Sequence, residues 1–259
     1  MPIKSRSRLP YLILLLLTCT SLLALTAYLL GGSPTARAGK QPVAEAAGTA
    51  GESVGNTSTI ACVVIDAGHG GEDGGASSAV GLLEKDLNLS VSLALRDLFE
   101  AAGIPVVMTR TEDMLLYDRN VDFHGRKKIL DLAARRLVAE KTAEATERGA
   151  CLFLSIHMNA FPQPQYNGMQ VWYGTGDPTS QAVAEAIQTA SATLMPSNTR
   201  KIKAAGSNIY LLDRIKTPAV LVECGFLSNP AEAERLSRED YRLALAAAVF
   251  GAVMPFCGA

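Results

Sequence analysis

From about residue 59 onward, apolar residues follow two patterns: short continuous runs, and longer stretches in which they recur every three or four positions. Residues 60–65 form a continuous β-rich run that ends in Asp66-Ala67-Gly68, which is typical of a strand followed by a turn. Between residues 87 and 102, apolar side chains recur every three or four positions as far as Gly103, which predicts a helix. The same patterns predict further strands at 104–108, 151–156, 169–173, 207–212 and 219–222, and further helices at 126–148, 179–194 and 239–253.

Short apolar strands separated by helices are typical of a sheet that is covered on both faces. No internal repeat is visible in the sequence, and one domain over residues 59–257 accounts for all the predicted elements. We therefore predict an α/β fold: a single domain with a mostly parallel six-stranded sheet flanked by helices on both faces. Such sheets bind ligands outside the carboxyl ends of their strands, which is where His69, His157 and Glu223 stand in the predicted pattern.

The N-terminal segment differs from the rest because residues 11–30 contain no charged side chain. A helix of this length spans about 30 Å, the thickness of the hydrocarbon core of a bilayer, and the basic residues at positions 4–8 favour a cytoplasmic N-terminus. Residues 1–38 are predicted to be a cleaved signal peptide or an uncleaved signal anchor that holds the protein on the membrane. Residues 39–58 are predicted to be a flexible linker. Both alternatives place the domain outside the cytoplasm, in the cell wall or anchored facing outward.

Composition narrows the classes of protein that the chain can belong to. Its 259 residues are 48% hydrophobic and 19% charged, which excludes a chain that is disordered throughout. The formal net charge is −1, but residues 1–38 hold four basic and no acidic residues, so the remainder carries 20 basic against 25 acidic residues. A mildly acidic domain lacks the basic face that binding to nucleic acid requires.

The five cysteines follow no metal-binding pattern, because the sequence contains neither a Cys-x-x-Cys pair nor a Cys/His cluster. Cys62, Cys151 and Cys224 each lie in a strand-like apolar run, which indicates buried thiols. A disulfide bond is possible in a protein outside the cytoplasm, but the sequence does not indicate which cysteines would form it.

Two of the three histidines, His69 and His157, follow predicted strands. A catalytic zinc ion typically takes three imidazole or carboxylate ligands and leaves one position for water, while a free carboxylate nearby acts as the general base. The two histidines together with Glu84 and Glu223 would supply this set. The alternative is that the two imidazoles only form hydrogen bonds with the backbone at the strand ends. The third histidine, His124, is interpreted as a surface residue.

Four segments contain these residues: Val64-Ile-Asp-Ala-Gly-His-Gly-Gly71, Glu84-Lys-Asp-Leu-Asn-Leu89, Leu154-Ser-Ile-His-Met-Asn-Ala160 and Val222-Glu-Cys-Gly-Phe-Leu-Ser-Asn229. In this order they resemble the motifs of the zinc-dependent N-acetylmuramoyl-L-alanine amidases of the Amidase_3 family. The resemblance covers about residues 60–256, and the family fold is an α/β sheet with flanking helices. Segments 206–212 and 126–128 are most similar to the germination-specific branch of the family, which acts in the spore cortex.

The resemblance implies a role for each matched residue. His69, Glu84 and His157 match the ligands of a Zn²⁺ ion, and Glu223 matches the catalytic glutamate that activates the attacking water. The implied substrate is peptidoglycan, cut at the amide between N-acetylmuramic acid and the L-alanine of the stem peptide. The spore-cortex branch further implies a part in forming muramic lactam, and an activating protein partner.

Residues beside the motifs have open or minor roles. Asn159 is predicted to bind a substrate amide, and Asp66 is predicted either to orient His69 as a hydrogen-bond acceptor or to cap the turn. Cys224 departs from the family pattern, but alternation along a strand directs its side chain away from Glu223.

Several other residues are interpreted without a catalytic role. Glu72 and Asp73 are expected to be solvated acids of the loop after the first histidine motif. Trp172 is interpreted as a core residue, with a place in a sugar or peptide groove as the alternative. The charged face of the helix at 126–148 is interpreted as solvent-exposed, with a partner-docking face as the alternative.

Two other functions are compatible with the same fold. One is a non-catalytic module that binds the cell wall or a partner, which the complete set of ligands and base disfavours. The other is a zinc peptidase that cuts within the stem peptide. The residues of the metal site do not separate this peptidase from the amidase.

Overall fold

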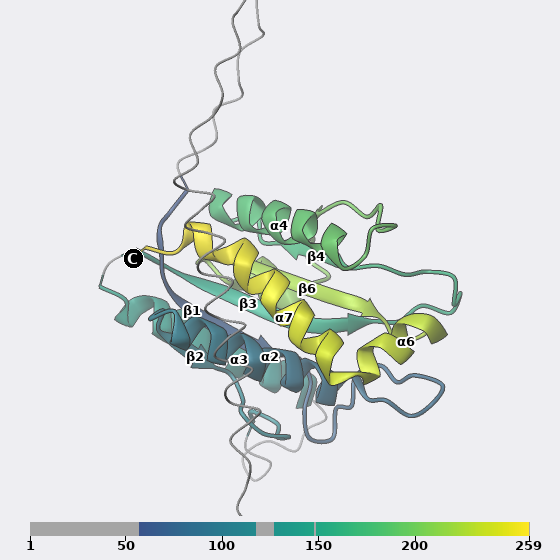
Figure 1. Ribbon diagram of the computed structural model, residues 1–259. Coiled ribbons are helices and arrows are strands. Elements are labelled where there is room, and N and C mark those ends of the chain that lie inside the picture. The colour runs from purple at the N-terminus through teal and green to yellow at the C-terminus, as the bar shows by residue number, and fades with distance from the viewer. Residues whose placement is uncertain (1–56, 118–126, 148, 259) are drawn as a thin grey trace, which may run out of the picture. The chain divides into compact units, whose positions relative to one another are not determined.

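A six-stranded sheet forms the centre of the domain built by residues 57–117, 127–147 and 149–258, which are the residues that the computed structural model describes (Figure 1). The strands lie in the order β2-β1-β3-β6-β4-β5. Every neighbouring pair is parallel except β4 and β6, which confirms the predicted mostly parallel sheet. The strands are β1 (Ile60–Ala67), β2 (Val106–Met108), β3 (Ala150–Asn159), β4 (Gln170–Tyr173), β5 (Lys203–Ala204) and β6 (Ala219–Phe226).

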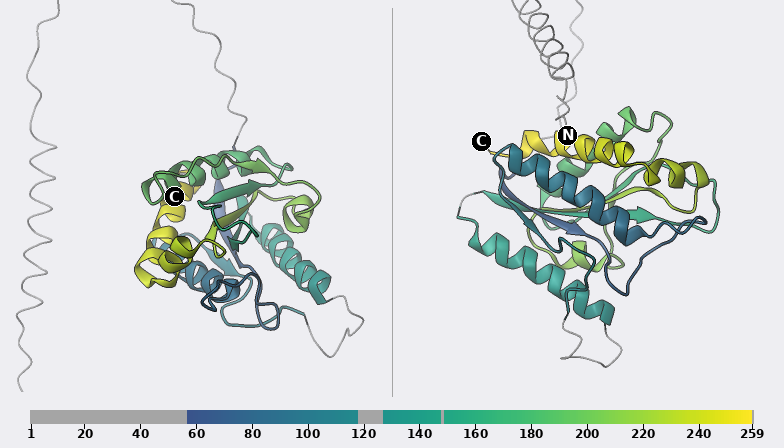
Figure 2. Two further views of the ribbon diagram at one scale, coloured as in Figure 1. Left: turned by 90° about the vertical axis from the view of Figure 1, so that its right-hand side faces the viewer. Right: turned by 60° about the horizontal axis from the view of Figure 1, so that its bottom comes forward.

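Helices cover both faces of the sheet, as the sequence predicts (Figures 1 and 2). Helices α2, α4 and α7 pack on one face, whereas α3 and the short α5 pack on the other. The α-helices are α2 (Glu84–Ala101), α3 (Lys127–Ala145), α4 (Pro178–Ala190), α5 (Tyr210–Arg214), α6 (Pro230–Ser237) and α7 (Glu239–Val253), with short 3-10 turns at Ser191–Thr193 and Met254–Phe256.

The predictions for residues 1–38, for most of the linker at 39–58 and for His124 fall outside the described residues. Among the residues that are described, none of the helices is both long and apolar enough to cross a membrane.

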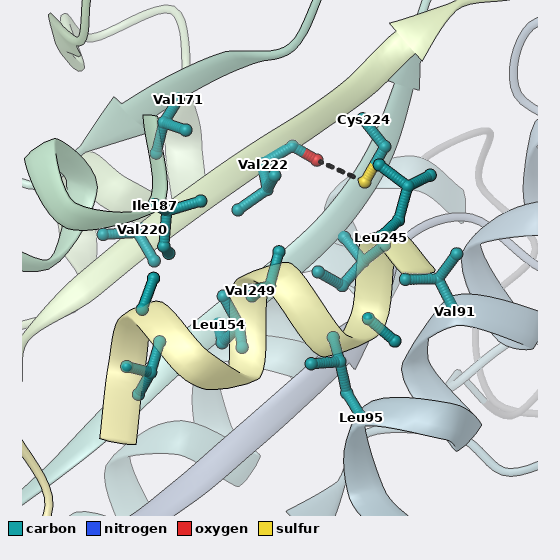
Figure 3. Close-up of a cluster of buried hydrophobic side chains, with 14 of the residues drawn as sticks. Val91, Leu95, Leu154, Val171, Ile187, Val220, Val222, Cys224, Leu245 and Val249 are labelled. Atoms are coloured by element: carbon teal, nitrogen blue, oxygen red, sulfur yellow. Dashed lines mark hydrogen bonds between the residues drawn. The ribbon is translucent and has the colours of Figure 1, made fainter. Parts of the chain in front are cut away.

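The larger core lies between the sheet and helices α2, α4 and α7. Helix α2 contributes Val91 and Leu95, which are fully buried and four residues apart, so they lie on one helix face. Figure 3 shows these side chains packed near Leu245 and Val249 of α7. Cys224 is a buried free thiol in this core, which confirms that its side chain points away from the face that carries Glu223.

One predicted element is wrong. The strand predicted at residues 207–212 is a turn followed by helix α5, and the sixth strand of the sheet is instead the two-residue β5. The buried residues Leu211, Leu212 and Ile215 are spaced one and three positions apart. This spacing fits one side of a helical turn, and a short apolar run does not distinguish it from a strand by sequence alone.

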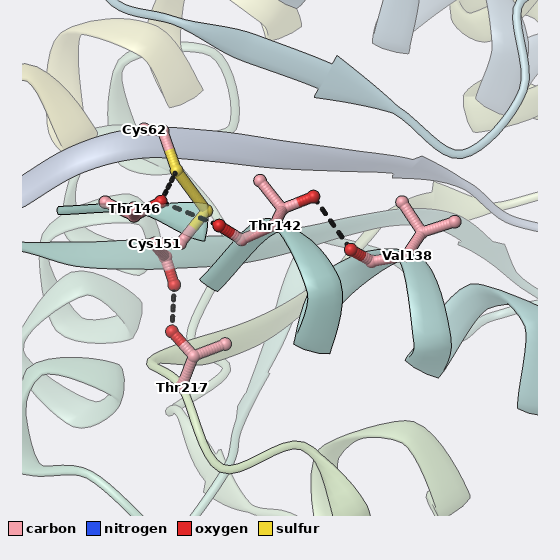
Figure 4. The surroundings of a disulfide bond; sticks show 6 residues. All are labelled: Cys62, Val138, Thr142, Thr146, Cys151 and Thr217. Atoms are coloured by element: carbon pink, nitrogen blue, oxygen red, sulfur yellow. Dashed lines mark hydrogen bonds between the residues drawn. A yellow bond between two sulfur atoms is a disulfide. The ribbon is translucent and has the colours of Figure 1, made fainter. Parts of the chain in front are cut away.

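Cys62 and Cys151 correct the prediction of buried thiols. Both are buried, but they form a disulfide bond (Figure 4). They are register partners on the adjacent strands β1 and β3, and their Cα atoms lie 4.8 Å apart. Because the two cysteines are 89 positions apart in sequence, they meet only through the pairing register of β1 with β3.

The disulfide is expected to stabilise the domain because it closes a long loop in the unfolded chain. We predict that the double substitution Cys62→Ala with Cys151→Ala lowers the free energy of unfolding by roughly 2–5 kcal/mol, measured by urea unfolding. Reductant should destabilise the wild-type chain and the Cys257→Ala control equally, and should leave the double variant unchanged. If the double variant is as stable as the oxidised wild-type chain, the disulfide contributes no stability.

Candidate active site

The carboxyl ends of three neighbouring strands bring the predicted site residues together. His69 follows β1 by two residues, His157 lies near the end of β3, and Glu223 lies in β6. His157 and Glu223 are register partners, so their side chains share one face of the sheet. The parallel order β1-β3-β6 thus places all three residues at one edge, where the sequence pattern predicts a ligand site.

Glu84 is the first residue of α2, and its carboxylate joins the two imidazoles. Its Oε1 atom lies 3.2 Å from Nε2 of His69 and 2.9 Å from Nδ1 of His157. Its Oε2 atom accepts a 2.8 Å hydrogen bond from the backbone N–H of Ala76. Burial acts to raise the pKa of Glu84, but the hydrogen bonds from both imidazoles outweigh it and hold that pKa well below its usual range.

Two glycines make room for these side chains. A Cβ atom on Gly68 would lie 2.3 Å from the ring of His157, and one on Gly75 would lie 2.5 Å from Oε2 of Glu84. Gly75 also has a φ of +65°, in the left-handed region. His69 itself has a φ of +62°, a sparsely populated conformation for a residue with a side chain. The loop between β1 and α2 is therefore shaped around the imidazole–carboxylate cluster.

The cluster fits a metal ion. One ligand atom each from His69, Glu84 and His157 lies within 4.8 Å of the others. Two imidazole nitrogens and a carboxylate oxygen are a donor set that suits zinc. The Nδ1 atom of His69 lies 2.8 Å from Oδ2 of Asp73, a partner that fixes the ring orientation. Burial acts to lower the pKa of His69, but the bonds to Glu84 and Asp73 raise it overall.

Glu223 lies beside the cluster and is not part of it. Within the described part of the chain, its buried Oε2 atom has no hydrogen-bond partner. Burial raises the pKa of Glu223 to about 7, and the nearby Glu84 adds to the shift while His157 opposes it. A carboxylate with a pKa near neutrality is well suited to take and return a proton.

The raised pKa predicts how the metal-free domain responds to pH. A carboxyl group that binds its proton more tightly in the folded state stabilises it less as the pH rises. Below pH 4.5, Glu223→Gln and wild type should therefore have nearly the same free energy of unfolding. Above pH 7, Glu223→Gln should be the more stable protein by on the order of 3 kcal/mol. Urea unfolding at both pH values measures it, with the exposed Glu185→Gln as control. A constant difference across this range would contradict the prediction.

A cavity of about 340 Å³ gives access to these residues. Its wall includes His69, His157 and Glu223 from the strand ends, and side chains from α3 and α5 close the opposite side. The cavity therefore opens on the sheet face that faces away from the larger core.

Asp66 does not act as the sequence suggests. Its Oδ1 atom accepts a 2.8 Å hydrogen bond from Thr109 and lies 2.5 Å from Nη1 of Arg135, and its Oδ2 atom accepts a 2.6 Å bond from Ser155. None of its hydrogen bonds to described residues involves His69. Burial acts to raise the pKa of Asp66, but the charge of Arg135 outweighs it and lowers that pKa.

Arg135 corrects the interpretation of α3 as a helix with a solvent-exposed charged face. Its side chain is 2% exposed and donates to the carboxylates of Asp66 and Asp131. It also donates to the backbone carbonyls of Ala67 and His69, at 2.8 and 2.7 Å. Arg135 therefore ties the turn that carries His69 to the core, with Asp66 as its buried counter-charge.

Removing Arg135 should destabilise the domain because it leaves the Asp66 carboxylate buried without its counter-charge. We predict that Arg135→Ala lowers the free energy of unfolding by about 3 kcal/mol. The adjacent Arg136 pairs with Glu140 across 3.4 Å and is 37% exposed, so Arg136→Ala should cost less than about 0.5 kcal/mol. Equal losses for the two variants in urea unfolding would contradict this role of Arg135.

Sequence reasoning missed Asp73 and Arg135. Asp73 stands four residues after His69, and only the folded loop makes this spacing a contact. Arg135 has one sequence signal, the acidic Asp131 four positions earlier on the same helix. Such a pair is common on exposed helix faces, so it does not indicate burial by itself.

The predicted substrate-binding residue Asn159 lies outside the His69 cavity. It lines a second cavity, together with Trp172 and residues of the loops around β4 and β5. Trp172 is half-buried and packs against the smaller core, which agrees with its interpretation as a core residue, and its remaining surface lines the second cavity.

The fold and the cluster together define the class of protein: an α/β enzyme with a His/Glu/His cluster that fits a metal ion and a separate glutamate at the ends of the strands. Residues 63–254 match the Amidase_3 family of N-acetylmuramoyl-L-alanine amidases. The chain belongs to this family. It is an N-acetylmuramoyl-L-alanine amidase, and its substrate is peptidoglycan.

Individual relatives agree with this assignment. The chain is 35% identical over 195 residues to the germination-specific N-acetylmuramoyl-L-alanine amidase of Bacillus subtilis, an alignment that covers 75% of this chain and 78% of the relative. The CwlD amidase of Clostridioides difficile, solved in complex with the GerS lipoprotein, superposes with a TM-score of 0.68 at 34% identity and covers 75% of this chain and 97% of that one. The amidase AmiC2 of Nostoc punctiforme superposes with a TM-score of 0.61 at 28% identity over 78% of this chain and 98% of that one.

Proposed function

We propose that His69, Glu84 and His157 hold a Zn²⁺ ion and that Glu223 is the catalytic base. The observation that carries this proposal is the buried Oε2 atom of Glu223, which has no hydrogen-bond partner among the described residues and lies next to a converging His/Glu/His set. An acceptor without a partner at the wall of a cavity is a place where a water molecule can be held.

The residues of the chain divide the reaction between them. His69, Glu84 and His157 would hold the zinc ion, which would supply Lewis-acid polarisation of the carbonyl of the amide between N-acetylmuramic acid and L-alanine. Glu223 takes a proton from the attacking water and returns it to the nitrogen of the leaving L-alanine. Asp73 holds the imidazole of His69 in one orientation through the 2.8 Å bond to its Nδ1 atom.

We further propose that the enzyme acts on the spore cortex, where its product would feed the formation of muramic lactam. Two relatives support this narrower assignment: one is named as germination-specific, and the other was solved with a lipoprotein bound. The second relative also supports an activating protein partner for this chain.

The Cys62–Cys151 disulfide and the peptidoglycan substrate support a location outside the cytoplasm. In this proposal residues 1–38 direct the chain there or anchor it, residues 39–58 link it, and residues 59–257 catalyse the reaction.

Mass spectrometry of the products released from purified peptidoglycan by the zinc-loaded chain tests the proposal. We expect free stem peptides that begin at L-alanine and glycan strands with unsubstituted muramic acid. Fragments shortened within the peptide would instead indicate a zinc peptidase. Binding to the wall without release, even with a partner added, would indicate a non-catalytic module.

A further inference from the structure

The second cavity lies next to Glu223 but is separate from the metal cluster. Gln170 on its wall is the register partner of Glu223 across the antiparallel pair of β4 and β6. Residues paired in this way lie about 5 Å apart and point to the same face of the sheet. A substrate held at Glu223 therefore needs only one or two further residues to reach this cavity.

Two cationic side chains, each lying over an aromatic ring, line this second cavity, which we name the Arg200 pocket. The guanidinium of Arg200 lies 4.5 Å from the ring centroid of Phe226, and Nζ of Lys203 lies 5.1 Å from that of Trp172. The pocket has a volume of about 240 Å³. Its lining residues are Asn159, Phe161, Tyr166, Gln170, Trp172, Arg200, Lys203 and Phe226, none of which is acidic.

Both cations are free to bind an anion. Within the described part of the chain, neither Arg200 nor Lys203 has a carboxylate partner. The Nε atom of Arg200 donates a 2.8 Å hydrogen bond to the carbonyl of Asn167, its Nη1 atom donates a long 3.5 Å bond to Oε1 of Gln170, and the ring of Phe226 supports its planar face. An arginine fixed in this way offers its remaining N–H groups to a carboxylate at little cost in side-chain entropy.

The other side of the site is not a purely cationic surface. The lining of the His69 cavity is mixed, because the acidic Asp73 and Asp131 stand beside the basic Lys128 and Arg135. The two ends of the substrate also differ, since the muramoyl side is an uncharged N-acetylated sugar and the stem peptide carries carboxylates. Charge complementarity therefore directs the peptide, not the glycan, into the Arg200 pocket.

We propose that the Arg200 pocket is the subsite for the stem peptide, in which Arg200 and Lys203 bind a carboxylate of the residue that follows L-alanine. This inference rests on the proposed function, because it takes Glu223 as the point where the amide is cut. It makes Arg200 and Lys203 specificity-determining residues, which neither hold the metal nor transfer the proton.

A binding experiment without turnover tests the subsite. The full chain carrying Glu223→Gln is titrated by NMR with N-acetyl-L-alanyl-D-glutamate and with its uncharged counterpart, N-acetyl-L-alanyl-D-glutamine amide. We expect the acid to bind about tenfold more tightly than the neutral peptide. Adding Arg200→Gln with Lys203→Gln should remove this preference, and adding Lys201→Gln, an exposed cation in the same loop that does not line the pocket, should retain it.

The outcomes separate this inference from the proposed function. Equal affinity for the two peptides, or a preference that survives in the folded Arg200→Gln, Lys203→Gln chain, overturns the subsite even if the unmodified chain cleaves peptidoglycan. A preference lost on substitution supports the subsite even if that chain cleaves nothing, in which case the proposed function alone fails. The exposed Lys203→Gln change alone should reduce the preference, which keeps the test decisive if the double variant does not fold.

Discussion

The substitution Glu223→Gln is expected to lower kcat on peptidoglycan by about 10²–10⁴-fold while the protein still binds one zinc ion. Glutamine keeps the shape of the side chain but cannot accept a proton, so only the general-base step is lost. The substitution does not change any of the three proposed ligands. Among the described residues, Oε2 of Glu223 also makes no hydrogen bond that the substitution could remove. The fold and the metal site should therefore be unchanged.

Two measurements check this result on the same sample. Zinc content is measured by elemental mass spectrometry, and turnover is measured by the release of stem peptides that begin at L-alanine. Loss of turnover together with loss of zinc would indicate a damaged site and not a missing base. Turnover within threefold of the wild-type value would contradict the catalytic role of Glu223.

The positions of His69, His157 and Glu223 could be predicted because they depend on local patterns. Each follows or ends a short apolar run, and the chemistry of α/β sheets is found at the carboxyl ends of the strands. The direction of Cys224 into the core was equally predictable, since side chains alternate along a strand.

The features that were missed depend on contacts between distant segments. The pairing of Cys62 with Cys151 requires the register of β1 and β3, which the pattern of one strand does not determine. The burial of Arg135 requires that α3 pack against the end of β1 and the turn that follows it. There the guanidinium pairs with the Asp66 carboxylate and donates hydrogen bonds to two backbone carbonyls. A sequence pattern assigns an arginine to the solvent by default.

The Arg200 pocket shows the same limit at the substrate site. The sequence predicts that Asn159 lies near the substrate, because it stands two residues after His157 in the third motif. Its neighbours Arg200 and Lys203 come from a segment in which no strand was predicted. That segment joins the site only because β4 pairs with β6 on one side and with β5 on the other, so that the loop before β5 places Arg200 over the ring of Phe226 at the end of β6.

The substitution Glu84→Gln is expected to abolish both zinc binding and turnover, in contrast to the same chemical change at Glu223. The carboxylate of Glu84 carries the only negative charge among the three proposed ligands, and both imidazoles contact its Oε1 atom. Loss of an outer hydrogen-bond partner of a metal ligand typically costs 10–100-fold in affinity, so loss of the anionic ligand itself should cost more than about 100-fold.

Thermal unfolding with and without added zinc separates a lost ligand from a lost fold. A metal that binds only the folded state raises Tm by mass action, so zinc should raise the Tm of the wild-type and Glu223→Gln chains. The Tm of the Glu84→Gln chain should be the same with and without added zinc. Glutamine retains one oxygen, which can accept the hydrogen bond from the backbone N–H of Ala76 but not also the one from Met158, so the fold should persist with a lower metal-free Tm than that of the wild type. A zinc-dependent rise in Tm as large as that of the wild type would exclude Glu84 as a ligand and leave the two imidazoles to hold the ion without it.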